Sequence, residues 1–280
     1  MQTYYDCYPC ILRQAIEAAR MTGATPEQTR ALVLQTLETL KQIPDGSTPP
    51  EISAHVHELV RGLVGCDDPY LSVKIEATEK ALNMVPELQQ RIEESEDPFS
   101  TALRISLAGN IMDFGPNPDY NLREVVMRVL NQTPALDETD ALRESLNRVD
   151  WVLFIGDNAG EIVFDRLFIE KIPCPVVYAV RGGPVINDAT LEDAILAGID
   201  SVAALIDTGA RIPGVVLSKS GRAFQEKFKA APLIIAKGMG NYETLSDVSA
   251  PIYFLFQVKC PVVGKDVGAD VQDIIISRRA

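Results

Sequence analysis

The sequence has no apolar run near the roughly 20 residues that a membrane-spanning helix needs. Its start, MQTYYDCYPC, lacks the charged and apolar regions of a signal peptide. Five cysteines in 280 residues are too few for a secreted disulfide scaffold. Basic residues are also scarce, because 26 Lys and Arg stand against 39 Asp and Glu, a net charge of -13. We therefore expect a cytoplasmic protein that binds neither nucleic acid nor an anionic membrane surface.

The usual ligands of a structural zinc site are sparse as well. Cys7 and Cys10 form the only Cys-x-x-Cys pair, and the two histidines, His55 and His57, are not spaced to complete a zinc site. We expect the cysteine pair to pack at the start of the first helix. A zinc site and a redox disulfide are the alternatives, with Cys260 as a conceivable third partner.

What the sequence does contain is two kinds of apolar periodicity, which change near residue 148. Before it, apolar residues recur every three or four positions in segments separated by Pro, Gly or Asp-Pro. After it, helical segments alternate with the short apolar runs WVLFIG, PVVYAV, SVAAL, GVVLS, PLIIA and PIYFLFQV. Strands without polar alternation are typical of parallel sheets covered by helices. We predict an α/β protein with a helical domain at 1–147 and a Rossmann-like, doubly wound, mainly parallel sheet at 148–280.

Three loops rich in chemical groups follow predicted strands. They are GDNAGE (156–161) after WVLFI, RGGPVINDAT (181–190) after PVVYAV, and KGMGNYETL (237–245) after PLIIA. In doubly wound sheets, ligands bind beyond the carboxyl ends of the strands. We therefore expect the three loops to meet at one edge, although 31 residues separate Asp157 from Asp188 and 49 separate Asp188 from Lys237.

Carboxylate and amide oxygens from Asp157, Asn158 and Asp188 suit a hard divalent cation such as Mg²⁺ or Mn²⁺. Simpler roles exist for two of these residues. Asp188 can cap the following helix, and Asn158 can tolerate a left-handed turn.

The same loops offer groups that suit a phosphate. Lys237 supplies a point charge, although a solvated lysine at a strand end is the alternative. Gly238 is one of several glycines that let the backbone approach a ligand closely. Arg181 is a second candidate phosphate contact, but a packing or salt-bridge role is more usual.

Five motifs together resemble a known family. They are GDNAGEIVFD, RGGPVINDAT and AKGMGNYETL, with the amino-terminal YDCYPC and the helical GNIMDFG. In order and approximate spacing, across nearly the whole chain, they resemble the metal-dependent damage-control phosphatases, once catalogued as domain of unknown function eighty-nine. YDCYPC resembles the prokaryotic branch, and the signatures of the eukaryotic branches are absent. The resemblance therefore does not indicate the substrate.

The resemblance implies a helical amino-terminal part, a Rossmann-like domain and a bound divalent metal (Mn, Mg, Co or Ni). By motif, the implied metal ligands are Asp157, Asn158 and Asp188. It further implies that Lys237 contacts the substrate phosphate, and that Asn110 and Asp113 of GNIMDFG wall the site.

The predicted reaction is hydrolysis of a small phosphomonoester, such as a sugar phosphate, a phosphorylated cofactor or a damaged metabolite. Water is expected to attack directly, with Glu161 or Asp188 as base, and Asp157 as a covalent nucleophile is the alternative. A nucleotide- or metal-binding regulatory module without turnover is a second hypothesis. A nicotinamide oxidoreductase is disfavoured because GDNAGE lacks the Gly-x-Gly-x-x-Gly spacing. The oligomeric state is not indicated.

Overall fold

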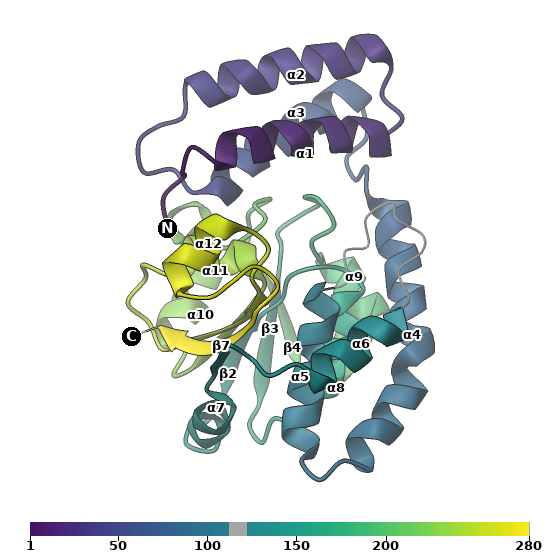
Figure 1. Ribbon diagram of the computed structural model, residues 1–280, viewed down its shortest axis with the longest axis vertical. Helices are drawn as coiled ribbons and strands as arrows, with labels where there is room; N and C mark the ends of the chain where they lie inside the picture. The colour runs from purple at the N-terminus through teal and green to yellow at the C-terminus, as the bar shows by residue number, and fades with distance from the viewer. Residues whose placement is uncertain (112–121, 280) are drawn as a thin grey trace.

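The computed structural model describes residues 1–111 and 122–279. A β-sheet lies at its centre (Figure 1). The sheet has seven strands in the order β1-β7-β6-β5-β2-β3-β4. The strands are β1 (Leu136–Asp137), β2 (Val152–Ile155), β3 (Val176–Val180), β4 (Ala204–Asp207), β5 (Ile234–Lys237), β6 (Ile252–Gln257) and β7 (Ile274–Arg279). Strands β2 to β6 are parallel, β7 is antiparallel to β6, and β1 is parallel to β7. The predicted mainly parallel α/β sheet is confirmed.

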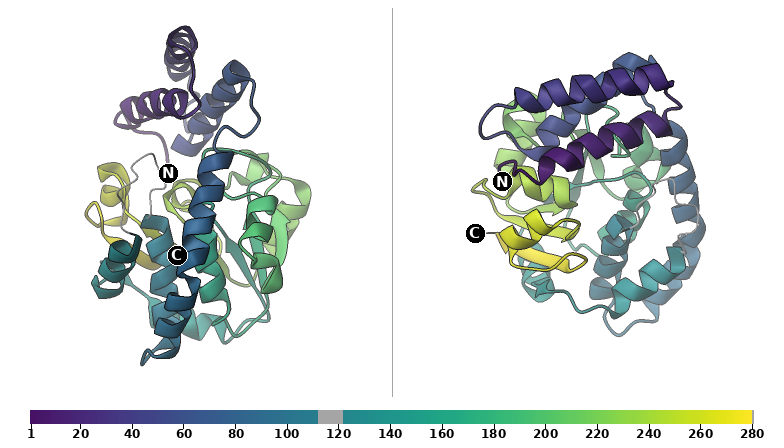
Figure 2. Two further views of the ribbon diagram at one scale, coloured as in Figure 1. Left: turned by 90° about the vertical axis from the view of Figure 1, so that its right-hand side faces the viewer. Right: turned by 45° about the horizontal axis from the view of Figure 1, so that its top comes forward.

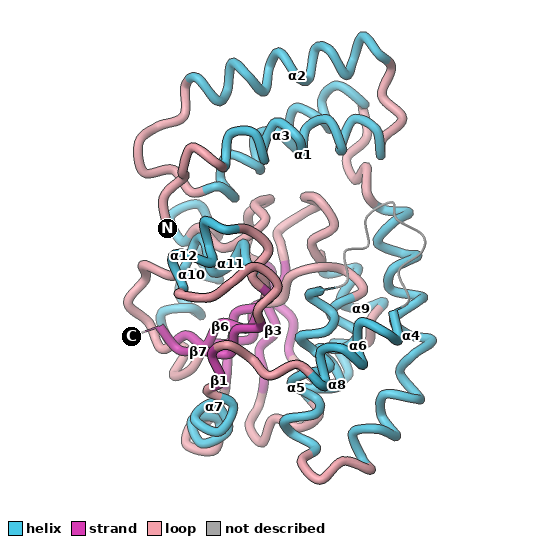
Figure 3. The backbone as a smooth tube through the Cα atoms, in the orientation of Figure 1, coloured by secondary structure: helices cyan, strands magenta, loops and turns pink. Residues whose placement is uncertain are grey.

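Helices cover both faces of this sheet, which explains why its central strands are apolar throughout (Figure 3). Alternate residues of a strand point to opposite faces, so Phe154 of β2 packs in one core and Leu153 in the other. The first face is covered by α4 (Leu71–Glu93), α5 (Pro98–Ile111), α6 (Leu122–Asn131), α7 (Thr139–Leu146), α8 (Glu161–Ile169) and α9 (Leu191–Leu196). The second is covered by α10 (Arg222–Ala230), α11 (Met239–Leu245) and α12 (Pro261–Val267).

The first three helices form a bundle with a core of its own. They are α1 (Cys7–Met21), α2 (Pro26–Lys41) and α3 (Pro49–Val64). Capping boxes at Thr25 and Thr48, each followed by a proline, fix where α2 and α3 begin. The bundle lies across one end of the sheet (Figures 1 and 2), and it faces the loops that follow the parallel strands.

The structure divides the helical half differently from a single domain at 1–147. Strand β1 precedes residue 147 and extends the edge of the sheet beside β7. Helices α4 to α7 belong to the core on the sheet, so only α1 to α3 stand apart. Lys74 of α4 is buried and forms ion pairs with Asp68 (2.7 Å) and with Asp193 of α9 (2.8 Å). The ion pair between Lys74 and Asp193 joins the helical half to the α/β half.

Two local predictions were wrong. GVVLS, read from its apolar residues as a strand, is a loop that leads into a short 3-10 helix at Leu217–Lys219. Its Val215 is buried against the second face of the sheet, so the apolar run reflects loop burial. Much of KGMGNYETL is helix α11, which buries Tyr242 and Leu245 in the same core. None of the described helices is long and apolar enough to cross a membrane.

Candidate functional site

Polar side chains gather at the carboxyl ends of neighbouring parallel strands. Asp157 follows β2, Arg181 follows β3, and Lys237 is the last residue of β5. The sheet extends from β2 through β3 to β4 on one side, and from β5 to β6 on the other. The chain order therefore reverses between β2 and β5, and such a switch point is where doubly wound sheets bind ligands.

Backbone hydrogen bonds hold the loop after β2 against the loop after β3. The amide of Ala189 donates to the carbonyl of Asp157 (2.8 Å), and the amide of Ala159 donates to the carbonyl of Asn187 (2.8 Å). These two bonds bring the side chains of Asp157 and Asp188 together across 31 residues of sequence.

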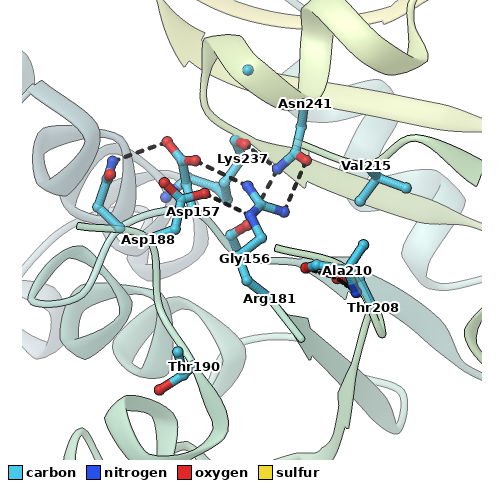
Figure 4. Close-up of polar contacts among 12 residues, drawn as sticks. Gly156, Asp157, Arg181, Asp188, Thr190, Thr208, Ala210, Val215, Lys237 and Asn241 are labelled. Carbon is cyan, nitrogen blue, oxygen red and sulfur yellow. Dashed lines mark hydrogen bonds and ion pairs between the residues drawn. The ribbon is translucent and has the colours of Figure 1, made fainter. Parts of the chain in front are cut away.

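Arg181 lies between the two carboxylates (Figure 4). Its Nε donates to Asp188 Oδ2 (2.6 Å), its Nη2 donates to Asp157 Oδ1 (3.2 Å), and its Nη1 donates to Asn241 Oδ1 (3.2 Å). The side chain is 1% exposed. These contacts fit the salt-bridge alternative for Arg181 better than a contact with a substrate phosphate.

Lys237 is enclosed by partners from helices α8 and α5. Its Nζ lies 2.6 Å from Asp165 Oδ1 and 2.7 Å from Glu161 Oε1, both in α8. It also donates to the carbonyl (3.0 Å) and hydroxyl (2.9 Å) of Ser106 in α5. The residue is 0% exposed. The expected contact between Lys237 and a substrate phosphate is therefore not supported, because its ammonium is already surrounded by acceptors.

Two amides connect the carboxylates of the site. Asn110 Nδ2 donates to Asp157 Oδ2 (3.0 Å) and to Glu161 Oε2 (3.1 Å). Asn158 Nδ2 donates to the same two oxygens at 2.9 and 3.0 Å. Through Asn110, which lies in the GNIMDFG motif, helix α5 reaches the site. Asp113, the other residue expected from that motif, lies outside the described residues.

Gly238 gives Asp157 the room that its side chain occupies. The φ angle of Gly238 is +78°, and a Cβ atom there would lie 2.0 Å from Asp157 Oδ2. Both its backbone conformation and its missing side chain are thus required. Gly238 therefore makes room for a protein carboxylate, and this explains the glycine without a contact to a ligand.

The site contains more negative than positive charge. Four largely buried carboxylates contact two buried cations; the acids are Asp157, Glu161, Asp165 and Asp188, and the cations are Arg181 and Lys237. Burial and the neighbouring Asp188 and Glu161 raise the pKa of Asp157 to about 8. By count, the four acids outnumber the two cations by two, one in the group around Arg181 and one in the group around Lys237.

A cavity of about 470 Å³ opens in front of Asp157, Asn158 and Asp188. Its other walls come from α11, from the segment after β6, and from α1 and α3 of the bundle. Its volume lies within the range of roughly 300 to 1,000 Å³ that is common for small-molecule sites. The bundle therefore covers the strand ends and encloses a space of metabolite size.

The cysteine pair lies at the start of α1, beside this cavity. Cys7 is buried in the core of the bundle, while Cys10 and Cys260 are partly buried. All three also line the cavity, and none forms a disulfide. Packing by Cys7 fits this position, and the zinc and redox alternatives stay predictions.

The chemistry of Asp157, Asn158 and Asp188 fits a hard divalent cation. All three carry oxygen atoms that can act as ligands, and the carboxylates of Asp157 and Asp188 have only Arg181 as a cation between them. Asn158 faces the carboxylates with its amide nitrogen, so ligation through its oxygen would require the amide to turn over. Among the described residues no three His, Cys, Asp or Glu side chains form a metal-binding group. A cation would therefore depend on two carboxylates, the amide and water.

Several residues of the site were not predicted from the sequence. Asp165 and Ser106 each interrupt an apolar helical run, in EIVFDRLF and RISLAG, which is a usable signal of a buried polar contact. Asn241 lies in the loop sequence KGMGNYETL, but no pattern there indicates a role for it. Lys259 follows strand β6 by two residues, so the rule applied to the other strand ends also identifies it.

Fold and site together define a doubly wound α/β protein with an acidic pocket at the switch point of its sheet. Residues 3–275 match the family model described as damage-control phosphatase ARMT1-like domain. The chain is 33% identical to a damage-control phosphatase of Pyrococcus horikoshii, over 95% of this chain and 94% of that protein. It is 34% identical to a damage-control phosphatase of Archaeoglobus fulgidus, over 96% of each.

A further relative, an uncharacterized protein of Methanocaldococcus jannaschii, is 34% identical over 98% of this chain and 94% of its own length. A crystal structure of a DUF89 family protein from Pyrococcus horikoshii superposes with a TM-score of 0.90, at 31% identity and over the whole of both chains. The chain therefore belongs to the damage-control phosphatase family, as its motifs indicated.

Proposed function

We propose that the protein hydrolyses small phosphomonoesters with a divalent cation held by Asp157, Asn158 and Asp188. The observation that carries this proposal is the pair of carboxylates Asp157 and Asp188, which line the cavity and share a single cation, Arg181, so that a bound cation would offset their remaining negative charge. Oxygen ligands favour Mg²⁺ or Mn²⁺, with Co²⁺ or Ni²⁺ as alternatives. Membership of a phosphatase family supports the reaction class.

A bound cation would polarise a phosphoryl oxygen and offset the negative charge that develops on it during hydrolysis. Asp188 is the best placed base. It lines the cavity, and its Oδ1 makes no hydrogen bond with another described residue. Beside the lone pair of Oδ1 that would ligate the cation, a second lone pair would accept a proton from water while the water oxygen bonds to phosphorus and the ester oxygen departs, taking up a proton from solvent.

The other two candidates for direct chemistry are less suited. The carboxylate of Glu161 is closed off by Lys237 on one oxygen and by two amides on the other. Although burial alone would raise the pKa of Glu161, Lys237 lowers it, which makes Glu161 a weak base. Asp157 also accepts hydrogen bonds on both oxygens, so we place direct attack by water before a covalent intermediate on Asp157.

Lys259 is the cation that the geometry offers to a substrate phosphate. It is exposed, lines the same cavity as Asp157 and Asp188, and makes no hydrogen bond or ion pair with another described residue. Its charge acts on Asp157: burial raises the pKa of Asp157, and the positive charge of Lys259 lowers it in part. We therefore assign to Lys259 the phosphate contact that the sequence assigned to Lys237.

Replacing Lys259 by alanine should lower kcat/KM for phosphomonoesters by about 10- to 100-fold, because one charge-assisted hydrogen bond to phosphate is lost. Metal affinity should stay unchanged, since an ammonium cannot ligate a cation. Steady-state kinetics and calorimetric titration with Mn²⁺ measure the two effects. Lys265→Ala, an exposed lysine in α12, is the matched control. Equal kinetics for the two variants would exclude Lys259 as the phosphate contact.

The proposal predicts phosphate release that depends completely on a divalent cation. The purified protein would be freed of metal with a chelator and assayed on sugar phosphates and phosphorylated cofactors, with Mn²⁺, Mg²⁺, Co²⁺ or Ni²⁺ added back in turn. We expect release from at least one substrate, and only after metal is added. Turnover that persists after complete chelation would contradict the metal-dependent mechanism.

The same assay separates the two other hypotheses. A regulatory module would bind metal or nucleotide without releasing phosphate from any substrate. A nicotinamide oxidoreductase lacks support because the turn after β2 reads GDNAGE, and Asn158 stands where a dinucleotide-binding turn has the glycine that approaches the pyrophosphate.

A further inference from the structure

Glu243 is a buried carboxylate in the cavity that the proposed reaction does not use. It lies in α11 and is 9% exposed. Its side chain makes no hydrogen bond or ion pair with another described residue, although its backbone carbonyl accepts one from the amino group of Met1. The side-chain oxygens of Glu243 are not sealed inside the protein, so they have access to the cavity that the residue lines.

The position of Glu243 relative to the reaction site follows from helix geometry. Met239, Gly240 and Glu243 all line the cavity, and their spacing of three and four residues places them on one face of α11. Glu243 lies four residues after Met239, roughly 6 Å further along the helix at 1.5 Å per residue. The helix begins directly after Gly238, which touches Asp157. Glu243 is thus one helical turn away from the strand ends.

An unpaired carboxylate at this depth requires a partner with positive charge or a proton to donate. Burial raises the pKa of Glu243 to about 7, although the ammonium of Met1 acts in the opposite direction. Lys259 lines the same cavity, but it is assigned above to the phosphate. Arg13 also lines the cavity but pairs with Glu17, and the ammonium of Met1 pairs with Asp247. A partner for the carboxylate of Glu243 can therefore be supplied by the substrate.

We propose that Glu243 selects phosphomonoesters that carry a primary amine about one helical turn from the phosphate. The inference rests on the proposed phosphatase function and names the substrate class of the same site. A protonated amine would form an ion pair with Glu243 while the phosphate lies near Lys259 and the strand ends. A substrate with a hydroxyl at that place would form only a neutral-donor hydrogen bond, which is weaker.

The test compares substrates that differ in one group. Two pairs serve: glucosamine 6-phosphate with glucose 6-phosphate, and 2-aminoethyl phosphate with 2-hydroxyethyl phosphate. At about pH 8, with saturating Mn²⁺, the parent protein should prefer the amine of at least one pair by about tenfold or more in kcat/KM. In Glu243→Gln this preference should fall below about threefold, because the amide keeps an acceptor for a hydroxyl but carries no charge.

A binding measurement keeps this inference separate from the proposed reaction. The increase in thermal unfolding temperature caused by each phosphate ester reports binding without turnover. The amine ester should give the larger increase in the parent protein, and this advantage should vanish in Glu243→Gln. Glu226→Gln, an exposed glutamate on α10, should retain the preference.

The outcomes distinguish the two proposals. If no ester is hydrolysed with any metal, the phosphatase proposal fails, and the unfolding temperatures alone decide the role of Glu243. If esters are hydrolysed but neither pair shows an amine preference, the role of Glu243 is wrong and the phosphatase proposal stands. An amine preference that survives in a folded Glu243→Gln variant would also show that the proposed role of Glu243 is wrong.

Discussion

Replacing Asp157 by asparagine is expected to lower phosphate release by about a thousandfold or more, because the change removes one of the two carboxylates that would hold the catalytic cation. Asp157 lines the cavity and contacts Arg181, Asn110 and Asn158. Calorimetric titration should show a matching loss of affinity for Mn²⁺. The asparagine side chain keeps the size of aspartate, so the loss should come from charge and not from a change in packing.

Stability should respond in the opposite direction. In the metal-free protein the pKa of Asp157 is raised from 3.8 to about 8 by burial and by Asp188 and Glu161. The unfolded carboxyl ionises near its ordinary pKa, so folding must take up a proton between these two values, and this group makes the parent protein less stable as pH rises from about 4 to 8. Asp157→Asn removes that dependence. With chelator present, the variant should be as stable as the parent protein or more stable at neutral pH.

The matched control is Asp207→Asn. Asp207 ends strand β4, a parallel strand of the same sheet, but it is not among the described residues that line the cavity. Its Oδ1 accepts a hydrogen bond from the amide of Gly209 (2.7 Å), a turn contact that asparagine can also make. Near-parental activity for Asp157→Asn, with normal metal affinity, would leave Asp157 with the same turn role as Asp207.

The main architecture could be predicted because its causes are local. A strand that is covered on both faces has to be apolar along its whole length. This pattern is visible in the sequences of β2, β3, β5 and β6. Strand β1 has only two residues, too few to show any periodicity, and it exists because β7 lies beside it. Likewise, the burial of GVVLS depends on the sheet that it packs against, which its own residues do not describe.

The site was predictable where one rule sufficed. Asp157, Arg181 and Asp188 follow from the strand ends, since parallel strands present their carboxyl ends at one edge. The environment of Lys237 cannot be predicted from this rule, because its partners Asp165 and Ser106 are 72 and 131 residues away in the sequence. A lysine at the end of a strand can point to the ligand or into the protein, and only the packing of α5 and α8 decides between them.

Lys237→Met is expected to lower the free energy of unfolding by about 3 to 5 kcal/mol, the usual effect of removing one partner from a buried ion pair. Burial alone would lower the pKa of Lys237, but Asp165 and Glu161 raise it, so the ammonium is charged and holds both carboxylates. Methionine fills similar space without charge and leaves the two acids without their shared cation. Denaturant unfolding of the metal-free protein measures the loss.

Two further variants test whether charge is the cause of that loss. Lys229→Met, at an exposed lysine of α10, should change stability by about 0.5 kcal/mol or less. Combining Lys237→Met with Asp165→Asn and Glu161→Gln should recover a large part of the stability, because both unpaired acids are then neutral. A Lys237→Met protein as stable as its parent but with a raised KM for phosphomonoesters would show that Lys237 contacts the substrate after all. Lys237 would then replace Lys259 as the phosphate contact, because an ammonium that can be removed without cost to folding is not required to balance Asp165 and Glu161.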